Sequence, residues 1–313
     1  MNKIHLLDNG LINKIAAGEV VERPASVVKE LMENSIDAGA TSITVEIAEG
    51  GTSVIKITDN GKGIPKDEIR TAFMRHATSK IDSFEDLENV LTLGFRGEAL
   101  SSIASVAQVE MLTRTENDSM GIRIVINGGV VDREEECAAN VGTVFYVKNI
   151  FFNTPARRKF LKKPATEGSY ISEIVNRIAL GHPNIAIKYV NNGNIVLQTN
   201  GDGNVKNSLF YIYGKDIASK MLSLESEKEG YILKGLVGKP ELSRGNRNYE
   251  NFFINGRFIK STLVQNAVED AYKNKIMIGK FPIFALDLIV PSNTVDVNVH
   301  PTKLEVRFSD ENF

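Results

Sequence analysis

Apolar and polar positions follow two different periods in the first sixty residues of the chain. Between residues 24 and 38 the apolar side chains recur at the spacing of an amphipathic helix: Val27, Val28, Leu31, Met32 and Ile36. A proline in the first turn and a glycine just past the end support this helix. Residues 41–48 and 54–58 then alternate around two glycines, which predicts a β-hairpin.

The same reading predicts the remaining elements of the first half. We expect helices over 67–80 and 98–106, and strands over 107–114, 121–127 and 142–148. These elements indicate an α+β sandwich, in which helices cover one face of a largely antiparallel sheet.

The second half shows a different order of elements. The patterns predict strands over 231–238, 249–255 and 282–290, with a helix over 262–274. The last three form a strand, helix, strand unit, which would cross over right-handed onto a parallel neighbour. Asparagine and glycine accumulate over 191–207, so we expect two domains, 1–203 and 204–313.

Composition excludes several classes of protein. The chain has 313 residues, 42% hydrophobic and 24% charged, as expected for an ordinary globular protein. No apolar run approaches the roughly 18 residues of a membrane span, and no secretory signal is recognisable, so we expect a cytoplasmic protein without a membrane partner. A lone Cys137 and four scattered histidines exclude a cysteine-cluster or HExxH metal site, so any catalytic metal should have oxygen ligands.

The first helix places three polar side chains on the face opposite its apolar one. Glu30, Asn34 and Asp37 lie four and then three positions apart, so they share that face. A carboxylate such as Glu30 can take a proton from water, and the amide oxygen of Asn34 suits Mg²⁺. The alternative is that these residues form only the solvated side of an amphipathic helix.

Two glycine-containing loops favour the functional interpretation. The run DNGKG at residues 59–63 follows a strand and could be only a turn. The run LGFRGEAL at 93–100 places glycines directly before a helix, where free backbone N–H groups attract an anion such as phosphate. Neither loop is a Walker A or a Rossmann motif, so a different nucleotide-binding fold is needed.

These motifs resemble those of the GHKL ATPase superfamily, which includes gyrase-type topoisomerase subunits, Hsp90 chaperones and the MutL mismatch-repair proteins. Within it the chain is similar to MutL over essentially its whole length. The similarity is carried by IAAGEVVERPASVVKEL at 15–31, RHATSK at 75–80, NTPARRKFL at 153–161 and DVNVHP at 296–301. The resemblance implies a Bergerat-type ATPase sandwich followed by an α/β domain like the second domain of ribosomal protein S5.

The resemblance also assigns roles to individual residues. Glu30 corresponds to the general base that activates the attacking water, and Asn34 to the Mg²⁺ ligand that bridges the ATP phosphates. Asp59 corresponds to the carboxylate that accepts the adenine amino group, and Gly63 lets the base approach. Lys303 corresponds to a lysine that reaches the γ-phosphate, and a contact with the terminal phosphate alone would distinguish ATP from ADP.

The other residues expected at the nucleotide belong to the lid over the triphosphate and to the segment before it. The lid corresponds to Gly94, Phe95, Arg96, Gly97, Glu98, Ala99 and Leu100. The further nucleotide-site residues are Asp37, Thr78, Ser79 and Lys80.

Two basic groups are candidates for DNA contact. Arg157, Arg158 and Lys159 belong to a basic cluster after Pro155, which could equally be a solvated surface. Arg257 and Lys260 belong to a sparser second group, in line with the DNA-facing groove of the family. Phe151 and Phe152 are expected in the core.

The resemblance implies slow, Mg²⁺-dependent hydrolysis of ATP, with lid ordering and ATP-dependent dimerisation of two copies. The signal would pass to MutS, DNA and a downstream nuclease or helicase. Two alternatives remain at this point: a relative in the topoisomerase or chaperone line, and an ATP-gated scaffold whose hydrolysis is incidental. Residues 153–161 argue against the first.

Overall fold

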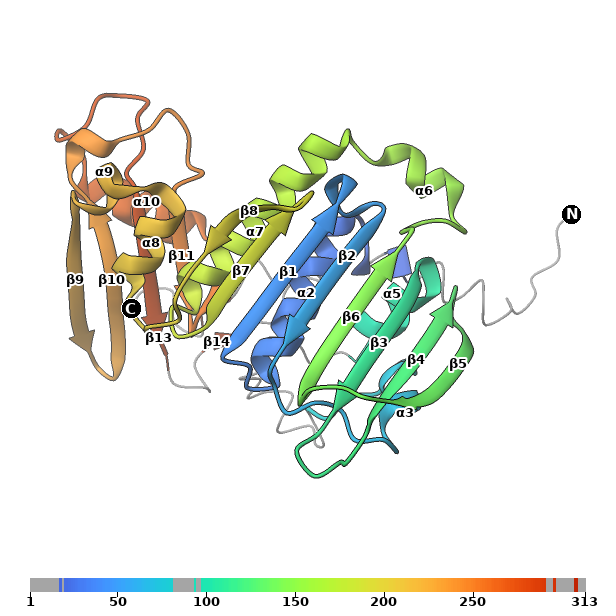
Figure 1. Cartoon of the computed structure of the whole chain (residues 1–313). Coiled ribbons are helices and arrows are strands. Elements are labelled where there is room, and N and C mark those ends of the chain that lie inside the picture. The colour runs from blue at the N-terminus through green and yellow to red at the C-terminus, as the bar shows by residue number, and fades with distance from the viewer. Residues whose placement is uncertain are drawn as a thin grey trace, which may run out of the picture. The chain divides into compact units, whose positions relative to one another are not determined.

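The computed structural model describes residues 17–18, 20–80, 93, 97–290, 295–296 and 307–308 (Figure 1). The chain divides into two compact units. The first is drawn from residues 1–82, 92–175 and 187–196, and the second from 83–91, 176–186 and 197–313. The single boundary after residue 203 that the sequence suggests stays a prediction.

An eight-stranded sheet forms most of the first unit, in the order β5-β4-β3-β6-β2-β1-β7-β8. Its strands are β1 (Ser42–Ala48), β2 (Val54–Asp59), β3 (Gln108–Arg114), β4 (Gly121–Asn127), β5 (Val130–Cys137), β6 (Gly142–Lys148), β7 (Ala186–Asn191) and β8 (Asn194–Gln198). The five pairs from β5 through to β1 are all antiparallel. Burial alternates along β1 and β2, which places Ile43, Val45 and Ile47 of β1 and Ile55 and Ile57 of β2 on the covered face.

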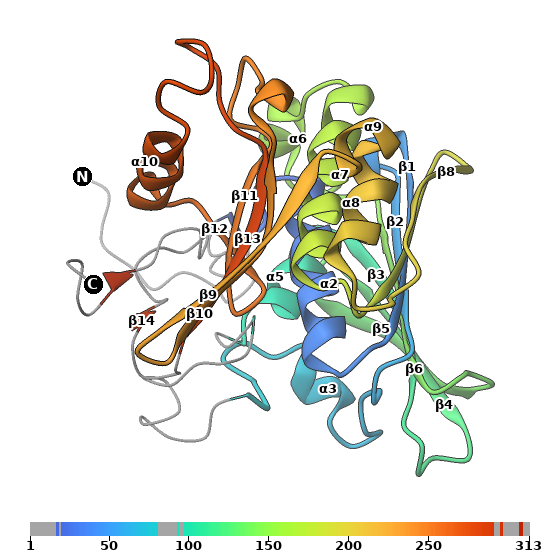
Figure 2. The same ribbon diagram turned by 90° about the vertical axis from the view of Figure 1, so that its left-hand side faces the viewer.

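Helices cover one face of this sheet. The helices between residues 24 and 181 are α2 (Pro24–Asp37), α3 (Ile69–Ala72), α5 (Ala99–Val106), α6 (Pro155–Phe160) and α7 (Pro164–Gly181), with a 3₁₀ turn η1 (Glu49–Gly51) between β1 and β2. Helix α6 has no buried residue and does not cover the sheet. Helix α2 packs on β1 and β2, and α5 packs on β3 and β4. Figure 2 shows both helices on the same side of the sheet. The sandwich predicted from the alternation is thus confirmed.

The second unit is built on a five-stranded sheet in the order β12-β11-β13-β10-β9. Its strands are β9 (Met221–Lys228), β10 (Tyr231–Gly238), β11 (Glu250–Ile254), β12 (Arg257–Ile259) and β13 (Phe284–Ile289). Strand β11 pairs parallel with β13, as the strand, helix, strand pattern predicts. The short strands β14 (Val295–Asp296) and β15 (Arg307–Phe308) pair antiparallel.

Helices lie on both faces of the second sheet. They are α8 (Val205–Tyr213), α9 (Lys215–Ala218) and α10 (Thr262–Ala271), with a 3₁₀ turn η2 (Pro240–Leu242). Phe253 of β11 joins the core beneath α8 and α9, whereas its neighbours Phe252 and Ile254 join the core beneath α10. Strand β11 is therefore buried throughout: its last three residues are apolar, and the polar Glu250 and Asn251 at its start are buried as well.

The helix expected over 67–80 is mostly wrong. Only Ile69–Ala72 is helical, and His76 takes a left-handed backbone conformation with φ of +59°. A left-handed non-glycine residue cannot continue an α-helix, so the chain turns there and brings residues 77–80 toward α2. The sequence analysis did not predict strands β5, β7, β8, β9 and β12 or helices α6 to α9.

Candidate functional site

Lys80 connects the polar residues of α2. Its ammonium donates to Asn34 Oδ1 at 2.9 Å and to Asp37 Oδ2 at 2.6 Å. The other oxygen of Asp37 accepts the backbone N–H of Leu93 at 3.0 Å. The face predicted from helical spacing is therefore a hydrogen-bonded cluster, and it draws in a lysine forty-three residues beyond Asp37. A cation approaching Asn34 Oδ1 must compete with this ammonium for the oxygen.

Glu30 has a neighbour that the sequence reading missed. Lys29 Nζ lies 3.4 Å from Glu30 Oε1 and 3.0 Å from Glu33 Oε1. Burial lowers the pKa of Lys29, but the carboxylates of Glu33 and Glu30 outweigh it, so the pKa is raised above its usual value. Lys29 therefore remains charged and favours the ionised form of Glu30, as a general base requires. The four-residue spacing of Lys29 and Glu33 was the signal for this pair.

Asp59 ends β2 and is buried at 9% exposure. Its Oδ2 accepts the hydroxyl of Ser35 at 2.7 Å, and its Oδ1 accepts the backbone N–H groups of Gly61 at 2.9 Å and Thr143 at 3.2 Å. Burial raises the pKa of Asp59, and these three hydrogen bonds oppose the rise. The carboxylate is therefore fixed in one orientation by α2, by its own loop and by β6.

Gly63 lies where the loop after Asp59 approaches the end of β3. It has φ of +72°, and a Cβ there would lie 2.2 Å from the carbonyl oxygen of Arg114. Ile64 N donates to Thr113 Oγ1 at 2.9 Å, and this hydroxyl lies 3.1 Å from that of Thr143. Only glycine fits this approach, and the threonines link the loop to the strands that hold Asp59.

The start of α5 meets the segment before the predicted lid. Gly97 has φ of +61°, and a Cβ on it would lie 2.6 Å from the carbonyl oxygen of Ala77. Glu98 Oε1 lies 3.4 Å from His76 Nδ1, and Ala99 and Leu100 open the helix. The Thr78 hydroxyl accepts the backbone N–H of Lys80 at 3.2 Å, and Ser79 adjoins it. Of the other candidates, Gly94, Phe95, Arg96 and Lys303 lie outside the described residues.

Comparison with known proteins identifies the family. A model described as "Histidine kinase-, DNA gyrase B-, and HSP90-like ATPase" matches residues 22–140, and one described as "DNA mismatch repair protein, C-terminal domain" matches 209–313. The DNA mismatch repair protein MutL of Agathobacter rectalis is 54% identical over 312 residues, which is 100% of this chain and 48% of that protein. The chain belongs to the MutL family. It carries an ATPase domain of the GHKL type.

Other MutL proteins agree with this assignment. That of Caldanaerobacter subterraneus subsp. tengcongensis is 49% identical over 311 residues, 99% of this chain and 53% of that protein. The solved "Aquifex aeolicus MutL ATPase domain complexed with ADP" superposes with a TM-score of 0.67 at 28% identity, over 87% of this chain and 93% of that one. The chain spans about half the length of the curated MutL proteins it matches.

The candidate DNA contacts of this MutL family member differ in exposure. Arg158, Lys159 and Lys260 are exposed. Arg157 is partly buried, and its guanidinium packs so close to Gly18 that a Cβ there would lie 2.2 Å from Nη2. Arg257 is only 8% exposed in β12, so its burial argues against a direct phosphate contact. Phe151 lies in the core as expected, whereas Phe152 is exposed and that prediction is wrong.

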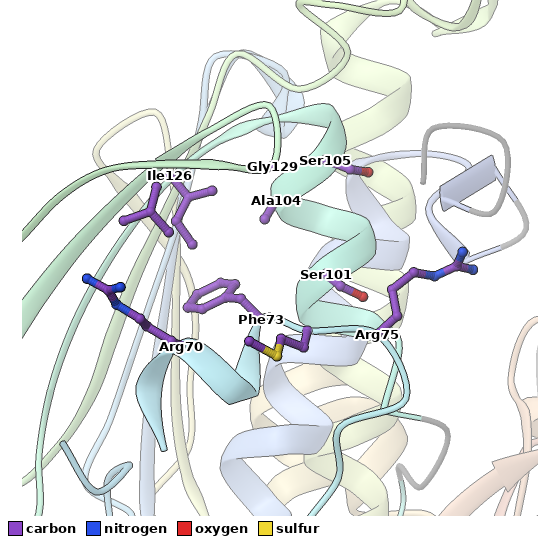
Figure 3. A pocket seen from close by; sticks show the side chains of 10 residues that line it. Arg70, Phe73, Arg75, Ser101, Ala104, Ser105, Ile126 and Gly129 are labelled. Carbon is purple, nitrogen blue, oxygen red and sulfur yellow. The ribbon is translucent and has the colours of Figure 1, made fainter. Parts of the chain in front are cut away.

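A cavity of about 450 Å³ is lined by none of Glu30, Asn34, Asp37, Asp59 or Lys80. Figure 3 shows it beside α5, with Phe73 and Ile126 lining it and the side chains of Arg70 and Arg75 extending on opposite sides. Both arginines are paired, Arg70 with Glu134 at 2.6 Å and Arg75 with Glu98 at 3.8 Å. None of the helices within the described ranges combines the length and apolar character of a membrane span.

Proposed function

We propose that the chain is the ATP-binding and ATP-hydrolysing part of a MutL-type mismatch-repair protein that acts in the cytoplasm. The observation that supports this proposal most strongly is the hydrogen bonding of Asp59, whose buried carboxylate accepts three hydrogen bonds at the start of the glycine-containing loop 59–63. A carboxylate fixed in this way can accept the amino group of adenine, and Gly63 leaves room for the ring. The ADP complex of the Aquifex aeolicus relative supports the choice of an adenine nucleotide.

The residues of α2 fit a triphosphate with Mg²⁺. The donor set is one amide oxygen, Asn34 Oδ1, beside the ammonium of Lys80. Mg²⁺ commonly takes few protein ligands and completes its shell with water and phosphate oxygens, so this donor set suits it. Asn34 would hold the ion, which when bound supplies positive charge to the phosphate oxygens. Lys80 is already oriented by Asp37, and we propose that it contacts the phosphates.

Glu30 takes the role of general base in this proposal. Its carboxylate accepts a proton from the attacking water, and the neighbouring Lys29 ammonium favours its ionised form. Gly97 and the start of α5 supply backbone N–H groups toward the phosphates. Gly94, Phe95, Arg96 and Lys303 would complete the site from outside the described residues.

The family assignment extends the proposal to partners. Nucleotide binding would promote association of two copies, and the dimer would connect MutS bound at a mismatch to DNA and to a downstream nuclease or helicase. Exposed Arg158, Lys159 and Lys260 are the proposed phosphate contacts.

Two measurements test this function. Calorimetry should show binding of ADP in preference to GDP, because a guanine carbonyl would face the Asp59 carboxylate; equal affinity would contradict the adenine site. Sedimentation with a non-hydrolysable ATP analogue should show a mass that rises with the analogue and not with ADP. A mass that stays the same with either nucleotide would contradict the dimerisation step.

A further inference from the structure

Within the described ranges, Ser35 is the one residue whose side chain donates a hydrogen bond to Asp59. It lies in α2, is 3% exposed, and its hydroxyl oxygen is 2.7 Å from Asp59 Oδ2. The same hydroxyl lies 3.1 Å from the carbonyl oxygen of Leu31. A hydroxyl has a single proton to donate, so Ser35 can direct it either to the carboxylate or to the carbonyl.

The hydrogen bonds of Asp59 leave one acceptor site for a nucleotide. An ionised carboxylate has about four acceptor sites, two on each oxygen. The backbone N–H groups of Gly61 and Thr143 occupy both sites of Oδ1, and the hydroxyl of Ser35 occupies one site of Oδ2. The remaining site is therefore on Oδ2, beside Ser35. An adenine amino group accepted there would share its oxygen with the Ser35 hydroxyl.

Burial and these three donors set the charge of Asp59. Burial raises the pKa of Asp59, and the Ser35 hydroxyl opposes this rise more strongly than the N–H groups of Gly61 and Thr143 do. The strand neighbours of Asp59 are Ile43 on β1 and Thr143 on β6, and no charged side chain of the described residues contributes to the shift. Ser35 is therefore the side chain that most favours the ionised form of Asp59.

The protonation state of Asp59 decides which base it can receive. The ionised carboxylate accepts a hydrogen bond from the 6-amino group of adenine. Hypoxanthine has a carbonyl at that position, so it forms a hydrogen bond with Asp59 only when Oδ2 carries a proton and donates it. Protonation would remove the charged acceptor of Ser35 and leave its hydroxyl with the Leu31 carbonyl, which is a weaker, neutral acceptor. Ser35 thus opposes the state of Asp59 that a 6-carbonyl base requires.

We propose that Ser35 is a specificity-determining residue of the nucleotide site, because its hydroxyl keeps Asp59 in the form that accepts an amino group and so disfavours bases with a carbonyl at the same position. Since it acts through Asp59, Ser35 is a positioning residue and not a catalytic one. The inference rests on the proposed adenine site and adds to it the residue that sets the selectivity of that site.

The test compares ADP with inosine diphosphate, which has a carbonyl in place of the 6-amino group, by calorimetry with Mg²⁺. The unchanged chain should bind ADP more tightly. Its affinity for inosine diphosphate should rise by up to about tenfold for each unit that the pH falls between about 8 and 6, because that complex takes up a proton. Ser35→Ala should reduce the ratio of the ADP affinity to the inosine diphosphate affinity by about 5- to 10-fold, mainly by tightening inosine diphosphate binding. Both nucleotides carry the same phosphates, so phosphate titration cancels in the ratio.

Further variants separate selectivity from packing. Ser35→Thr keeps the hydroxyl and should retain the ratio, even where its added methyl group lowers the melting temperature. Ser35→Cys keeps a side chain of similar size with a weaker donor, so its ratio should lie between those of Ser35→Ala and the unchanged chain. Ser105→Ala is the matched control, because Ser105 of α5 is also 3% exposed but donates to the backbone carbonyl of Ser102 at 2.8 Å. A loss of packing alone would weaken both nucleotides together and leave the ratio constant.

The outcomes separate the role of Ser35 from the adenine site beneath it. If the unchanged chain binds both nucleotides equally, the proposed adenine site fails and the role of Ser35 fails with it. If the chain prefers ADP and Ser35→Ala leaves the ratio and its pH dependence unchanged, only the role of Ser35 fails. If Ser105→Ala lowers the ratio as far as Ser35→Ala does, the loss of any buried serine explains the effect, and the role of Ser35 is again overturned.

Discussion

Replacing Asp59 by asparagine tests the adenine-binding role while keeping the surroundings of the side chain. An asparagine oxygen can accept the N–H groups of Gly61 and Thr143 in place of Oδ1. Its amide nitrogen then faces Ser35, whose hydroxyl can accept that proton and direct its own to the carbonyl of Leu31, 3.1 Å away. Every buried polar group keeps a partner, so we expect the fold to be unchanged.

Nucleotide binding should nevertheless fall steeply. The variant loses a hydrogen bond from the adenine amino group to a charged acceptor, worth about 1.5–3 kcal/mol, and faces that amino group with a second donor. Together we expect a loss of about 2–4 kcal/mol, which weakens ADP binding by about 30- to 1000-fold.

The stability of Asp59→Asn, unlike its nucleotide affinity, should rise or stay constant. Burial raises the pKa of Asp59, so the folded state holds the proton more tightly than the unfolded state does. The stability that protonated Asp59 contributes is therefore present below its unfolded pKa of about 3.8 and is lost as pH rises through the folded pKa. A neutral asparagine avoids that loss, so its melting temperature near neutral pH should equal or exceed that of the unchanged chain.

Calorimetry with ADP and Mg²⁺, together with thermal melts, checks both expectations. Asp132→Asn changes an exposed aspartate on β5 and serves as the control. Unaltered ADP affinity in Asp59→Asn, at an unaltered melting temperature, would refute the assignment of Asp59 to adenine.

Three further changes address other parts of the molecule. Glu30→Ala should keep ADP affinity within a few-fold while lowering phosphate release by about 100-fold or more; unchanged turnover would exclude the general base. Gly63→Ala should lower the free energy of unfolding measured in urea by about 2–4 kcal/mol, because its Cβ meets the Arg114 carbonyl. Gly39→Ala, which also has a positive φ (+75°) but open space around it, should lower the free energy of unfolding by only about 1–2 kcal/mol. Equal losses would exclude the contact as the cause. Burial raises the pKa of Glu250 to about 7, so the free energy of unfolding should fall as pH rises from 4.5 to about 7. In urea titrations across that range, Glu250→Gln should reduce this fall by about 1–3 kcal/mol. If the fall persists in Glu250→Gln, another group causes it.

Local patterns were sufficient to predict much of this architecture. The helix at 24–37, the hairpin of β1 and β2, and the helix at 99–106 follow from periodicity and glycine placement, which depend only on neighbouring residues. The sharing of one face by Glu30, Asn34 and Asp37 is likewise a property of helical geometry alone. Residues 73–80 escaped this reasoning because a left-handed His76 interrupts an otherwise helical pattern.

The hydrogen-bond partners of the site residues could not be predicted from the sequence, for a different reason. Ser35 reads as an ordinary helical serine, and only the packing of α2 on β2 brings its hydroxyl to Asp59. Arg257 and Phe160 show the same limit on the surface, since each lies in a basic stretch but one is buried and the other exposed.

The sequence by itself therefore determined which residue types stand at which turn of helix or end of strand, and from these the class of chemistry. Only the tertiary structure decided which side chains meet: Lys80 with Asn34 and Asp37, Ser35 and Thr143 with Asp59, and Arg157 with Gly18. The physical reason is that periodicity is set by bonds along the chain, whereas hydrogen bonds between distant segments depend on how whole elements pack.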